Sequence, residues 1–510
     1  MNIISFLILF PLIGSILMMF TQDKGRPTSL LDSLTTPRTL ALNISLINFL
    51  ASIWLWVSFN NSTAKFQFLS TLGTSSLLST ESHVYSQLNI NPTFGVDGIS
   101  VLFILLTTFL IPICILVGWT SINTYVKEYC IAFLVLESLV IAVFTSLDLL
   151  LFYVFFESVL IPMYIIIGVW GSADTKISAS YKLFLYTLAG SIFMLVGILM
   201  IYFQTGTTDY HILLTTEFSE SRQVLLWLSF FLAFAVKVPM VPFHIWLPAA
   251  HTAAPTAGSV ILAGILLKLG TYAFLRFSIP LFPYASIYFT PLVYTLSVLA
   301  IIYTSLSTIR QVDLKKVIAY SSVGHMGVVT LGLLSLNAEG IEGSMFLQLG
   351  HGIVSPALFI CVGILYDRHK TRIIRYYGGL VNSMPIFCTF FLVYTMANIG
   401  LPGLSPSFCG EFAVFLGTFL NNTLAAFLGA FSMILSGGYA LWAYGRVAYG
   451  APKQISAPHL NGTTCDVNRR EFVMLASLGV VNMLLAIYPE AVYQTMHVSI
   501  ANTIACVNLL

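Results

Sequence analysis

The sequence predicts an all-α polytopic membrane protein with about fourteen transmembrane helices. Three observations predict this class: hydrophobic residues make up 57% of the 510 residues, charged residues only 8%, and long apolar runs recur along the chain. A soluble surface needs about a quarter of its residues charged, so this chain cannot cover itself in water. The net charge of +2 also leaves no basic stripe for a phosphate backbone. Soluble enzymes, disordered tails and nucleic-acid binders are therefore excluded.

Each predicted span is a run of about 20 mostly apolar residues, the length that crosses a bilayer. The first run opens the chain without an Arg-rich presequence, so we expect a transmembrane helix there rather than a transit peptide. The predicted spans are 2–20, 38–59, 98–118, 129–147, 149–170, 180–203, 223–248, 255–275, 285–306, 316–336, 344–366, 386–419, 423–446 and 471–495.

Two predicted spans are irregular and stand at matching places in the chain. The seventh carries Pro239 and Pro242, and the twelfth carries Pro402 and Pro406, at offsets of 163 and 164 residues. The string FMLVGIL also recurs as FICVGIL 166 residues later, although chance recurrence is possible in a chain so rich in Val, Ile and Leu. These offsets predict two five-helix repeats, helices 4–8 and 9–13, with helices 7 and 12 broken. An odd number of helices inverts the second repeat, as in transporter cores.

The repeats divide the chain into four predicted parts. They are an N-terminal part with three helices and a long Ser/Thr-rich loop, the first repeat, the second repeat, and a C-terminal part with helix 14 and a short apolar tail after residue 495. Their bounds are 1–128, 129–275, 285–446 and 447–510.

Lysine and arginine are distributed unevenly between the predicted loops. Loops after odd-numbered helices hold 17 of the 22, loops after even-numbered helices hold Lys65, Arg222 and Arg276, and Lys237 and Lys268 lie inside spans. The positive-inside rule then places the odd-numbered loops on the cytoplasmic or matrix side and both termini on the other side.

Five charged residues fall inside predicted spans, where a charge costs about 2.5–3.5 kcal/mol at the bilayer centre. They are Glu137, Glu157, Lys237, Lys268 and Glu411, and His325 and His351 join them. A buried lysine can release its proton when a carboxylate partner moves away. Histidines titrate near neutrality and can bridge donors and acceptors. The pattern predicts a proton relay with Glu411 as a terminal acceptor.

Each of these residues also has a structural interpretation. A buried Lys–Glu pair could fix helix packing, and either histidine could satisfy serine or backbone partners. Glu137 could face a neighbouring subunit, and Asp148, at a span end, is expected to be a solvated boundary charge. A pure scaffold would gain by making so many buried charges apolar, which favours the relay over a scaffold. A solute transporter would need one roomy polar site, whereas these charges are spread over several helices.

The sequence shows no group of residues that we expect to bind a metal or a cofactor. The seven cysteines form no CxxC pair and no Cys/His cluster, and the chain carries no GxGxxG turn. We therefore expect neither a metal nor a cofactor-binding site.

Three stretches carry a clear family resemblance. FYVFFESVLIPMYIIIGVWG, AFAVKVPMVPFHIWLPAAHTAAPTAGSVILAGILLKLGTY and DLKKVIAYSSVGHMG resemble the antiporter-like membrane subunits of respiratory complex I, the proton-pumping NADH:quinone oxidoreductases. The resemblance covers about residues 95–450, and the HTAAPTAGSVILAGILLKLG run favours the middle of these subunits over its sisters. The first ninety or so residues and the tail beyond 450 fit the family poorly.

The resemblance also implies roles for the buried residues. A glutamate and a lysine form an ion pair that gates a half-channel, a second lysine is a central relay, two histidines follow along the axis, and a last glutamate leads to the exit. In that order the matching positions are Glu157, Lys237, Lys268, His325 with His351, and Glu411.

The resemblance further implies an enzyme subunit without redox chemistry of its own, which translocates protons driven by quinone reduction elsewhere. NADH, FMN, Fe–S clusters and ubiquinone are expected on partner subunits, and the expected partners are membrane-arm subunits, above all the sister antiporter-like ones, and the lipid bilayer. The expected location is the mitochondrial inner membrane, with the bacterial plasma membrane as the alternative. The rival functions are a subunit of a multisubunit cation/proton antiporter or membrane-bound hydrogenase, and a non-pumping scaffold.

Overall fold

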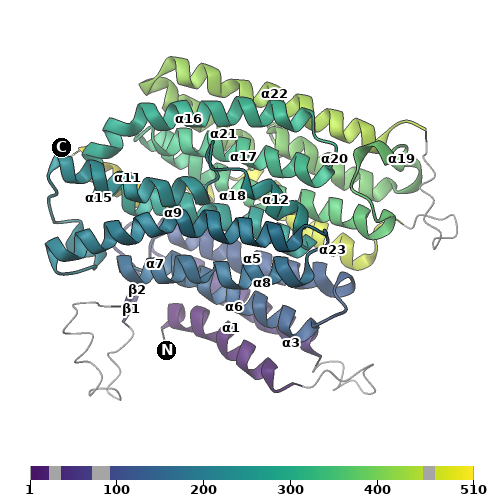
Figure 1. Cartoon of the computed structure of the whole chain (residues 1–510), viewed down its shortest axis with the longest axis horizontal. Coiled ribbons are helices and arrows are strands. Elements are labelled where there is room, and N and C mark those ends of the chain that lie inside the picture. The colour runs from purple at the N-terminus through teal and green to yellow at the C-terminus, as the bar shows by residue number, and fades with distance from the viewer. Residues whose placement is uncertain (1, 22–35, 72–91, 452–465, 509–510) are drawn as a thin grey trace.

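The chain folds into long helices that lie side by side along one common direction (Figure 1). The computed structural model describes residues 2–21, 36–71, 92–451 and 466–508. Within these residues, ten helices are long and apolar enough to cross a membrane, and Ile3–Met19 and Pro385–Ile399 are shorter apolar helices. The all-α polytopic class is confirmed, while the number fourteen stays a prediction. Lys24, Arg26, Lys453 and the centre of the long loop lie outside the described residues.

The N-terminal part contributes three helices and a small antiparallel sheet. The elements are α1 (Ile3–Met19), α3 (Pro37–Ser58), β1 (Gln67–Thr71), β2 (Thr93–Val96) and α5 (Gly98–Ser121). Asp97 starts α5 because its carboxylate accepts from the Ser100 amide at 3.1 Å while the Ser100 hydroxyl bonds the Asp97 backbone, a reciprocal cap. This cap fixes where the two-stranded sheet turns into the helix.

The first repeat follows, and its helices coincide with the predicted spans. The elements are α6 (Val126–Thr145), α7 (Leu149–Ser158), α8 (Leu160–Trp170), α9 (Lys176–Thr205), α10 (Tyr210–Leu213), α11 (Glu220–Lys237), α12 (Trp246–Ala253), α13 (Thr256–Ile261), η1 (Leu262–Leu266), α14 (Leu267–Ala273), η2 (Phe274–Ser278) and α15 (Ile279–Leu281).

The second repeat and the C-terminal part complete the chain. The elements are α16 (Pro283–Ile309), α17 (Leu314–Leu333), α18 (Ala338–His369), η3 (Ile374–Tyr376), α19 (Leu380–Ser383), α20 (Pro385–Ile399), α21 (Pro406–Asn421), α22 (Thr423–Ala448), α23 (Arg469–Ile487) and α24 (Glu490–Asn508).

Both predicted breaks are present, in the fourth span of each repeat. The first separates α11 from α12 around Pro239 and Pro242, and the second separates α20 from α21, where Gly400 and Gly403 adopt φ of +88° and +77°. In Figure 1, α11 lies toward the left end and α20 toward the right, so the two broken spans run in opposite directions. The inverted repeat is therefore visible in the fold.

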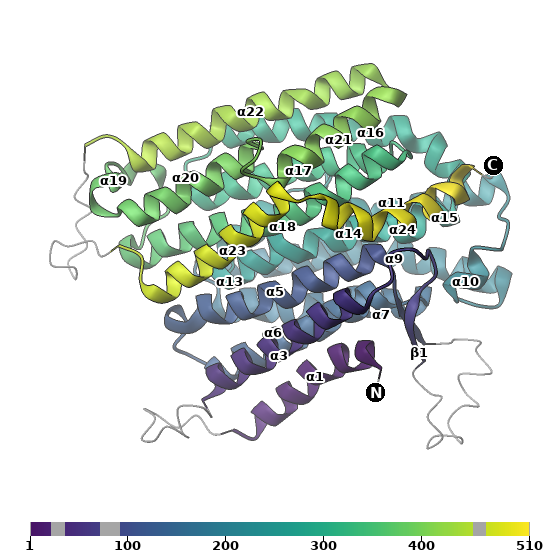
Figure 2. The ribbon, with the colours of Figure 1, turned by 180° about the vertical axis from the view of Figure 1, so that it is seen from behind.

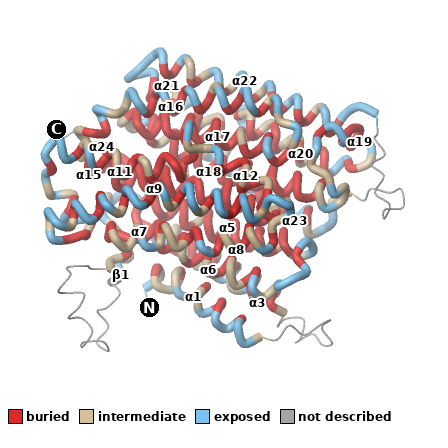
Figure 3. The backbone as a smooth tube through the Cα atoms, in the orientation of Figure 1, coloured by how far each residue is buried: buried red, intermediate tan, exposed pale blue. Residues whose placement is uncertain are grey.

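The eighth span contains two π-helical segments, η1 and η2, which the sequence analysis did not predict. Lys268 lies between them, and Arg276 lies within the second. Every residue of this span from Ala257 to Leu281 is buried, and Figure 3 shows the same for most of α18 at the centre of the molecule. Single-turn π segments often occur at functional sites, because they reorient side chains and free backbone carbonyls.

Backbone hydrogen bonds gather the loops after odd-numbered spans at one end. Ser172 bonds to Ala253, Ile374 to Val312, and Gly379 to Tyr449, at 2.9–3.1 Å. The arrangement agrees with the predicted charge asymmetry. Two residues of that tally are not loop charges, however, because Arg276 and Lys315 are both buried inside the protein.

The prediction of a short C-terminal tail is wrong. The last span was predicted over 471–495, but in the structure its helix, α23, ends at Ile487. After Pro489 the chain forms a further helix, α24, which packs along α5 and α18 (Figure 2). Its buried residues include Val492, Met496 and Ile500, which recur at helical spacing. Packing of this apolar stripe against α5 and α18 stabilises the helix.

Asp148 was expected to be a solvated boundary charge, and this is also wrong. Its carboxylate is buried and caps α7 by accepting from the amides of Leu150 and Leu151 at 2.9 Å and from the Thr208 hydroxyl at 2.7 Å. The charge is thus satisfied by helix-terminal donors rather than by water.

We predict that Gly343→Ala destabilises the contact between α18 and α21. A Cβ at this position would lie 2.7 Å from the Val414 nitrogen and 2.9 Å from the Gly410 oxygen, so backbone must shift at a cost of about 1–3 kcal/mol. When the protein is extracted from membranes and heated, the Gly343→Ala variant should unfold at a lower temperature than the wild type. Gly438→Ala is the control, because no atom lies within 4 Å of the added methyl group. Equal stability of both variants would contradict the prediction.

Candidate functional site

Lys268 forms the central contact of the site. Its Nζ lies 2.8 Å from Nδ1 of His351 and donates to the Ala263 carbonyl at 2.6 Å. Ala263 belongs to η1, so the π segment supplies a backbone acceptor five residues before the lysine. Both side chains are buried. A protonated amine at this place therefore has two acceptors inside an otherwise apolar interior.

The row continues from His351 through His325 to Glu411. The two imidazole rings are 5.7 Å apart between centroids, and Nδ1 of His325 lies 3.3 Å from Oε1 of Glu411. All three side chains are buried. Nε2 of each histidine and Oε2 of Glu411 find no hydrogen-bond partner among the described residues. Buried polar atoms without partners are costly, so these atoms mark places where a proton or a water can be accommodated.

Small residues bring the central lysine to the histidine. A Cβ on Gly352, next to His351, would lie 3.2 Å from the Gly264 oxygen, so α18 and η1 approach almost backbone to backbone here. Gly350, on the other side of His351, packs against Pro406 at the start of α21. The glycines on both sides of His351 therefore set its distance from the helices that carry Lys268 and Glu411.

The expected ion pair between Glu157 and Lys237 is not formed. The two charges are close enough to interact through space, but no ion pair of 4.0 Å or less joins these two described residues. The Lys237 amine instead donates to the Phe156 carbonyl at 3.4 Å and lies 4.2 Å from the Phe156 ring centroid. Glu157 is half-buried beside Ser191, and its Oε1 has no partner. The structure therefore holds this pair in a separated arrangement.

Lys237 is placed by the break in the seventh span. It is the last residue of α11, and the Trp246 indole, at the start of α12, donates to the Val236 carbonyl at 3.0 Å. This bond satisfies a carbonyl beside the break, as backbone at membrane depth requires. A Cβ on Gly270 of α14 would lie 3.2 Å from the Lys237 Cβ, so the lysine-bearing helices are in direct contact.

Glu137 does not face outward toward a neighbouring subunit, as one interpretation had it. Its side chain is fully buried, and Oε1 accepts from the Asn48 amide of α3 at 2.7 Å. Neither Oε2 of Glu137 nor Oδ1 of Asn48 has a partner. The residue lies apart from the row that runs from Lys268 to Glu411, and no described hydrogen bond connects the two.

Two further buried cations were missed by sequence reasoning. Arg276 donates to Asp97 at 2.6 Å and to the Tyr272 hydroxyl at 3.2 Å. Lys315 donates to the Ala254 carbonyl at 2.9 Å, near the buried His251 ring, which stacks on Phe359 and whose nitrogens bond no described residue. Both cations were assigned to loops because they lie near predicted span ends. The FGVDGIS run that holds Asp97 was the available signal for the first pair.

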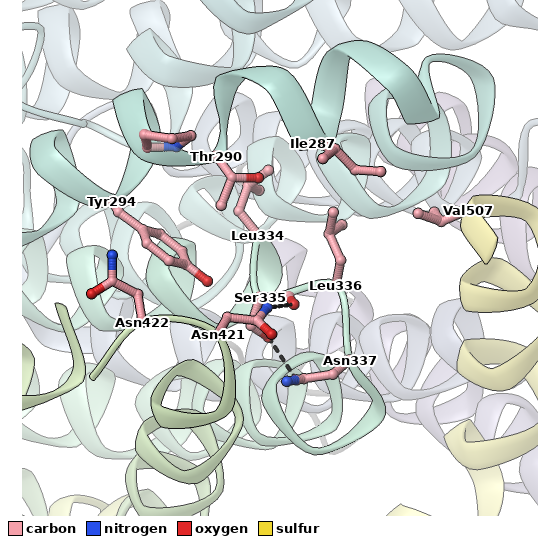
Figure 4. Close-up of a pocket in the computed structure, with 11 residues that line it drawn as sticks. Ile287, Thr290, Tyr294, Leu334, Ser335, Leu336, Asn337, Asn421, Asn422 and Val507 are labelled. Carbon is pink, nitrogen blue, oxygen red and sulfur yellow. Dashed lines mark hydrogen bonds between the residues drawn. The ribbon is translucent and has the colours of Figure 1, made fainter. Parts of the chain in front are cut away.

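A surface cavity of about 460 Å³ lies away from the row, among the ends of α16, α17, α21 and α24 (Figure 4). Figure 4 shows Tyr294, Asn421 and Asn337 around it, with Asn421 bonded to the Ser335 carbonyl. Its described lining residues are uncharged, so none of the buried charges of the row faces this cavity.

Two inverted five-helix repeats, broken fourth spans and a buried row of titratable side chains define an antiporter-like membrane subunit. Residues 146–436 match the family model described as NADH:quinone oxidoreductase/Mrp antiporter, TM. The chain is therefore a member of this superfamily, and relatives of known name place it more narrowly.

Over 98% of its length, the chain is 58% identical to NADH-ubiquinone oxidoreductase chain 4 of Prototheca wickerhamii and 59% identical to that of Marchantia polymorpha, covering 94% and 97% of those proteins. It also resembles a chain in the structure of respiratory complex I from Thermus thermophilus with bound NADH, with a TM-score of 0.86, 27% identity and 99% of each chain covered. The chain belongs to the NADH-ubiquinone oxidoreductase chain 4 family.

We predict that the Asp97–Arg276 pair is structural and separable from the row. Asp97→Asn alone removes the counter-charge of a buried arginine, which costs about 3–5 kcal/mol, whereas Asp97→Asn with Arg276→Met removes both charges and keeps a side-chain oxygen that can cap α5. The amount of protein assembled in membranes should fall in the single variant and recover in the double variant. Failure of the double variant to recover would show that the pair does more than anchor α5 to the eighth span.

Proposed function

We propose that the chain is a membrane-arm subunit of a proton-pumping NADH:ubiquinone oxidoreductase in the mitochondrial inner membrane. The observation that supports translocation most is the buried row of titratable side chains from Lys268 through His351 and His325 to Glu411. High identity to relatives named chain 4 favours this assignment over a cation/proton antiporter or a membrane-bound hydrogenase.

The proposed transfer begins at Lys268. Its Nζ gives a proton to Nδ1 of His351, which lies within hydrogen-bond distance. No hydrogen bond joins the two rings among the described contacts, and their centroids are 5.7 Å apart, so we propose that a water carries the proton to His325. His325 then passes it to Glu411 across 3.3 Å. The unpartnered Nε2 atoms give each histidine a second position at which to hold the proton.

The Glu157–Lys237 pair is the proposed switch at the entrance to this row. In the separated arrangement the lysine contacts only a carbonyl and an aromatic face, so its charge is weakly satisfied. Closure onto Glu157 would stabilise the protonated amine, and reopening would favour release of the proton toward Lys268. The drive for this movement is quinone reduction at a distance.

Redox chemistry is proposed to occur on other subunits of the complex. NADH, FMN, Fe–S clusters and ubiquinone would be bound there, and the sister antiporter-like subunits would be the immediate neighbours of this chain. Lysine, histidine and glutamate side chains hold and move protons but carry no electrons. The chain would therefore be a subunit of the enzyme that contributes translocation alone.

The proposed assignment predicts that the chain migrates with NADH dehydrogenase activity. Membranes solubilised in mild detergent and separated on a native gel should show the chain in a large band that oxidises NADH. Migration in a complex without NADH activity would contradict the assignment and favour the antiporter or hydrogenase alternative.

We predict that Lys237→Ala uncouples this subunit. Removal of a positioned proton carrier slows transfer by at least about a hundredfold, so the ratio of protons pumped to electrons transferred should fall while electron transfer to quinone continues. The measurement is proton uptake by reconstituted complex during NADH oxidation. Lys316→Ala is the control, because this lysine is exposed near the start of α17. A wild-type ratio in the Lys237 variant would refute the proposed switch.

A further inference from the structure

The cavity of about 460 Å³ lies on the side of the loops that follow even-numbered spans. Ser335 stands just after α17, the tenth span, and Asn421 ends α21, the second half of the twelfth. Tyr294 of α16 lines the cavity beside Asn421 (Figure 4). The tyrosine is only 3% exposed, and its hydroxyl lies near the Asn421 side chain but forms no hydrogen bond to a described residue. A buried hydroxyl of this kind requires water, and the cavity has room for it.

Two helices lead from this cavity to the acidic end of the buried row. His325 of α17 and Glu411 of α21 are in contact, with Nδ1 and Oε1 3.3 Å apart. Both helices continue to the cavity, where the Asn421 amide donates to the Ser335 carbonyl. Asn421 follows Glu411 by ten residues, which corresponds to about 15 Å of helix. The same two helices therefore carry the last groups of the row and the wall of the cavity.

Apolar side chains fill the interval between the row and the cavity. Val414 stands three residues after the glutamate of the row and is fully buried. Its methyl groups occupy the space beside Gly332 of α17, where an added Cβ would lie 2.6 Å from Val414 Cγ2. Next to them, a Cβ on Gly429 of α22 would lie 3.1 Å from Phe415 and 3.3 Å from Leu331. These contacts leave an apolar layer between the polar cavity and the acidic end of the row.

Polar groups resume beyond this layer. Thr418 follows Glu411 by about two turns on the same face of α21, and its side chain is buried. The Gly417 carbonyl accepts from the amide of Asn337, which lines the cavity, at 2.7 Å. An acid, an apolar layer and a polar cavity thus follow one another along α21. A narrow apolar constriction in such a series excludes water until it widens.

We propose that the cavity is the outlet of the row and that Val414, packed against Gly332, is the seal between Glu411 and the water of the cavity. The inference rests on the proposed function, because it needs a proton to arrive at Glu411. When the seal opens, the O–H bond of the protonated glutamate breaks and the proton passes to a water from the cavity. The hydronium ion leaves through the cavity, and the carboxylate accepts the next proton from His325. While the seal is closed, the outlet side cannot return a proton to the glutamate.

The test uses the intact complex with Val414→Ser, reconstituted into vesicles that oxidise NADH against an increasing proton gradient. Serine replaces the two methyl groups beside Gly332 with one hydroxyl, so water can stay in the constriction. The outlet side should then return protons to Glu411, and the ratio of protons pumped to electrons transferred should fall by up to the share that Lys237→Ala removes. This loss should grow with the gradient, whereas a merely structural defect would be the same at every gradient.

Val140→Ser is the matched control. Val140 is a fully buried valine near the end of α6 on the same side of the protein, and α6 carries no residue of the row. The control buries the same hydroxyl away from the proposed outlet. It should therefore show the wild-type ratio at every gradient.

Two outcomes would overturn the proposal: a wild-type response of Val414→Ser to the gradient, and an equal loss in Val140→Ser. If Val414→Ser does not assemble, Val414→Ala removes the same methyl groups without burying a hydroxyl. It should show the same gradient-dependent loss, and a wild-type response there would also overturn the proposal. Lys237→Ala separates the seal from the proposed function. A loss of pumping in Lys237→Ala with a wild-type response in the Val414 variants refutes only the seal, whereas wild-type pumping in Lys237→Ala refutes the proposed function itself.

Discussion

The contact between Lys268 and His351 is the interaction around which the rest of the fold is organised. A charge at membrane depth is tolerated only where protein, and not lipid, surrounds it. The eighth span that carries Lys268 and the long α18 that carries His351 are accordingly the most enclosed of the ten candidate membrane spans in the described part of the chain. The helices around them, such as α9, α16 and α22, present apolar side chains outward. The hydrophobic exterior thus insulates a titratable interior.

The inverted repeat places a broken span with a charged residue on either side of the contact between Lys268 and His351. Lys237 ends the first half of one broken span, and Glu411 lies in the first turns of the second half of the other. Because the two repeats have opposite orientations, the broken spans that carry Lys237 and Glu411 run toward the central contact in opposite directions. Two halves of one architecture can therefore serve as the entrance and the exit of a single row.

Much of this arrangement could be predicted from the sequence, because apolar runs, prolines and buried charges are local signals. Except for the last, the predicted ranges fall on helices of the structure, and Pro239, Pro242, Pro402 and Pro406 mark the two breaks. Features that depend on packing between distant segments could not be predicted. The π segments and the distance between Glu157 and Lys237 belong to this group, because neither leaves a periodic or compositional trace. The apolar stripe of α24 does leave a periodic trace, at Val492, Met496 and Ile500, which the analysis of apolar runs did not use.

Satisfaction of hydrogen bonds separates the buried charges into two kinds. Arg276 and Asp97 bond each other directly, and the arginine also bonds Tyr272 and lies over the Phe66 ring at 5.0 Å, so removing a proton there would leave a partner unpaired. His325 and Glu411 contact each other but retain unpartnered atoms. A relay requires groups that are not fully hydrogen-bonded, because a side chain that moves a proton must be almost as stable in its deprotonated form as in its protonated form. Incomplete satisfaction, more than burial, is therefore the property that distinguishes the candidate relay from the structural ion pairs.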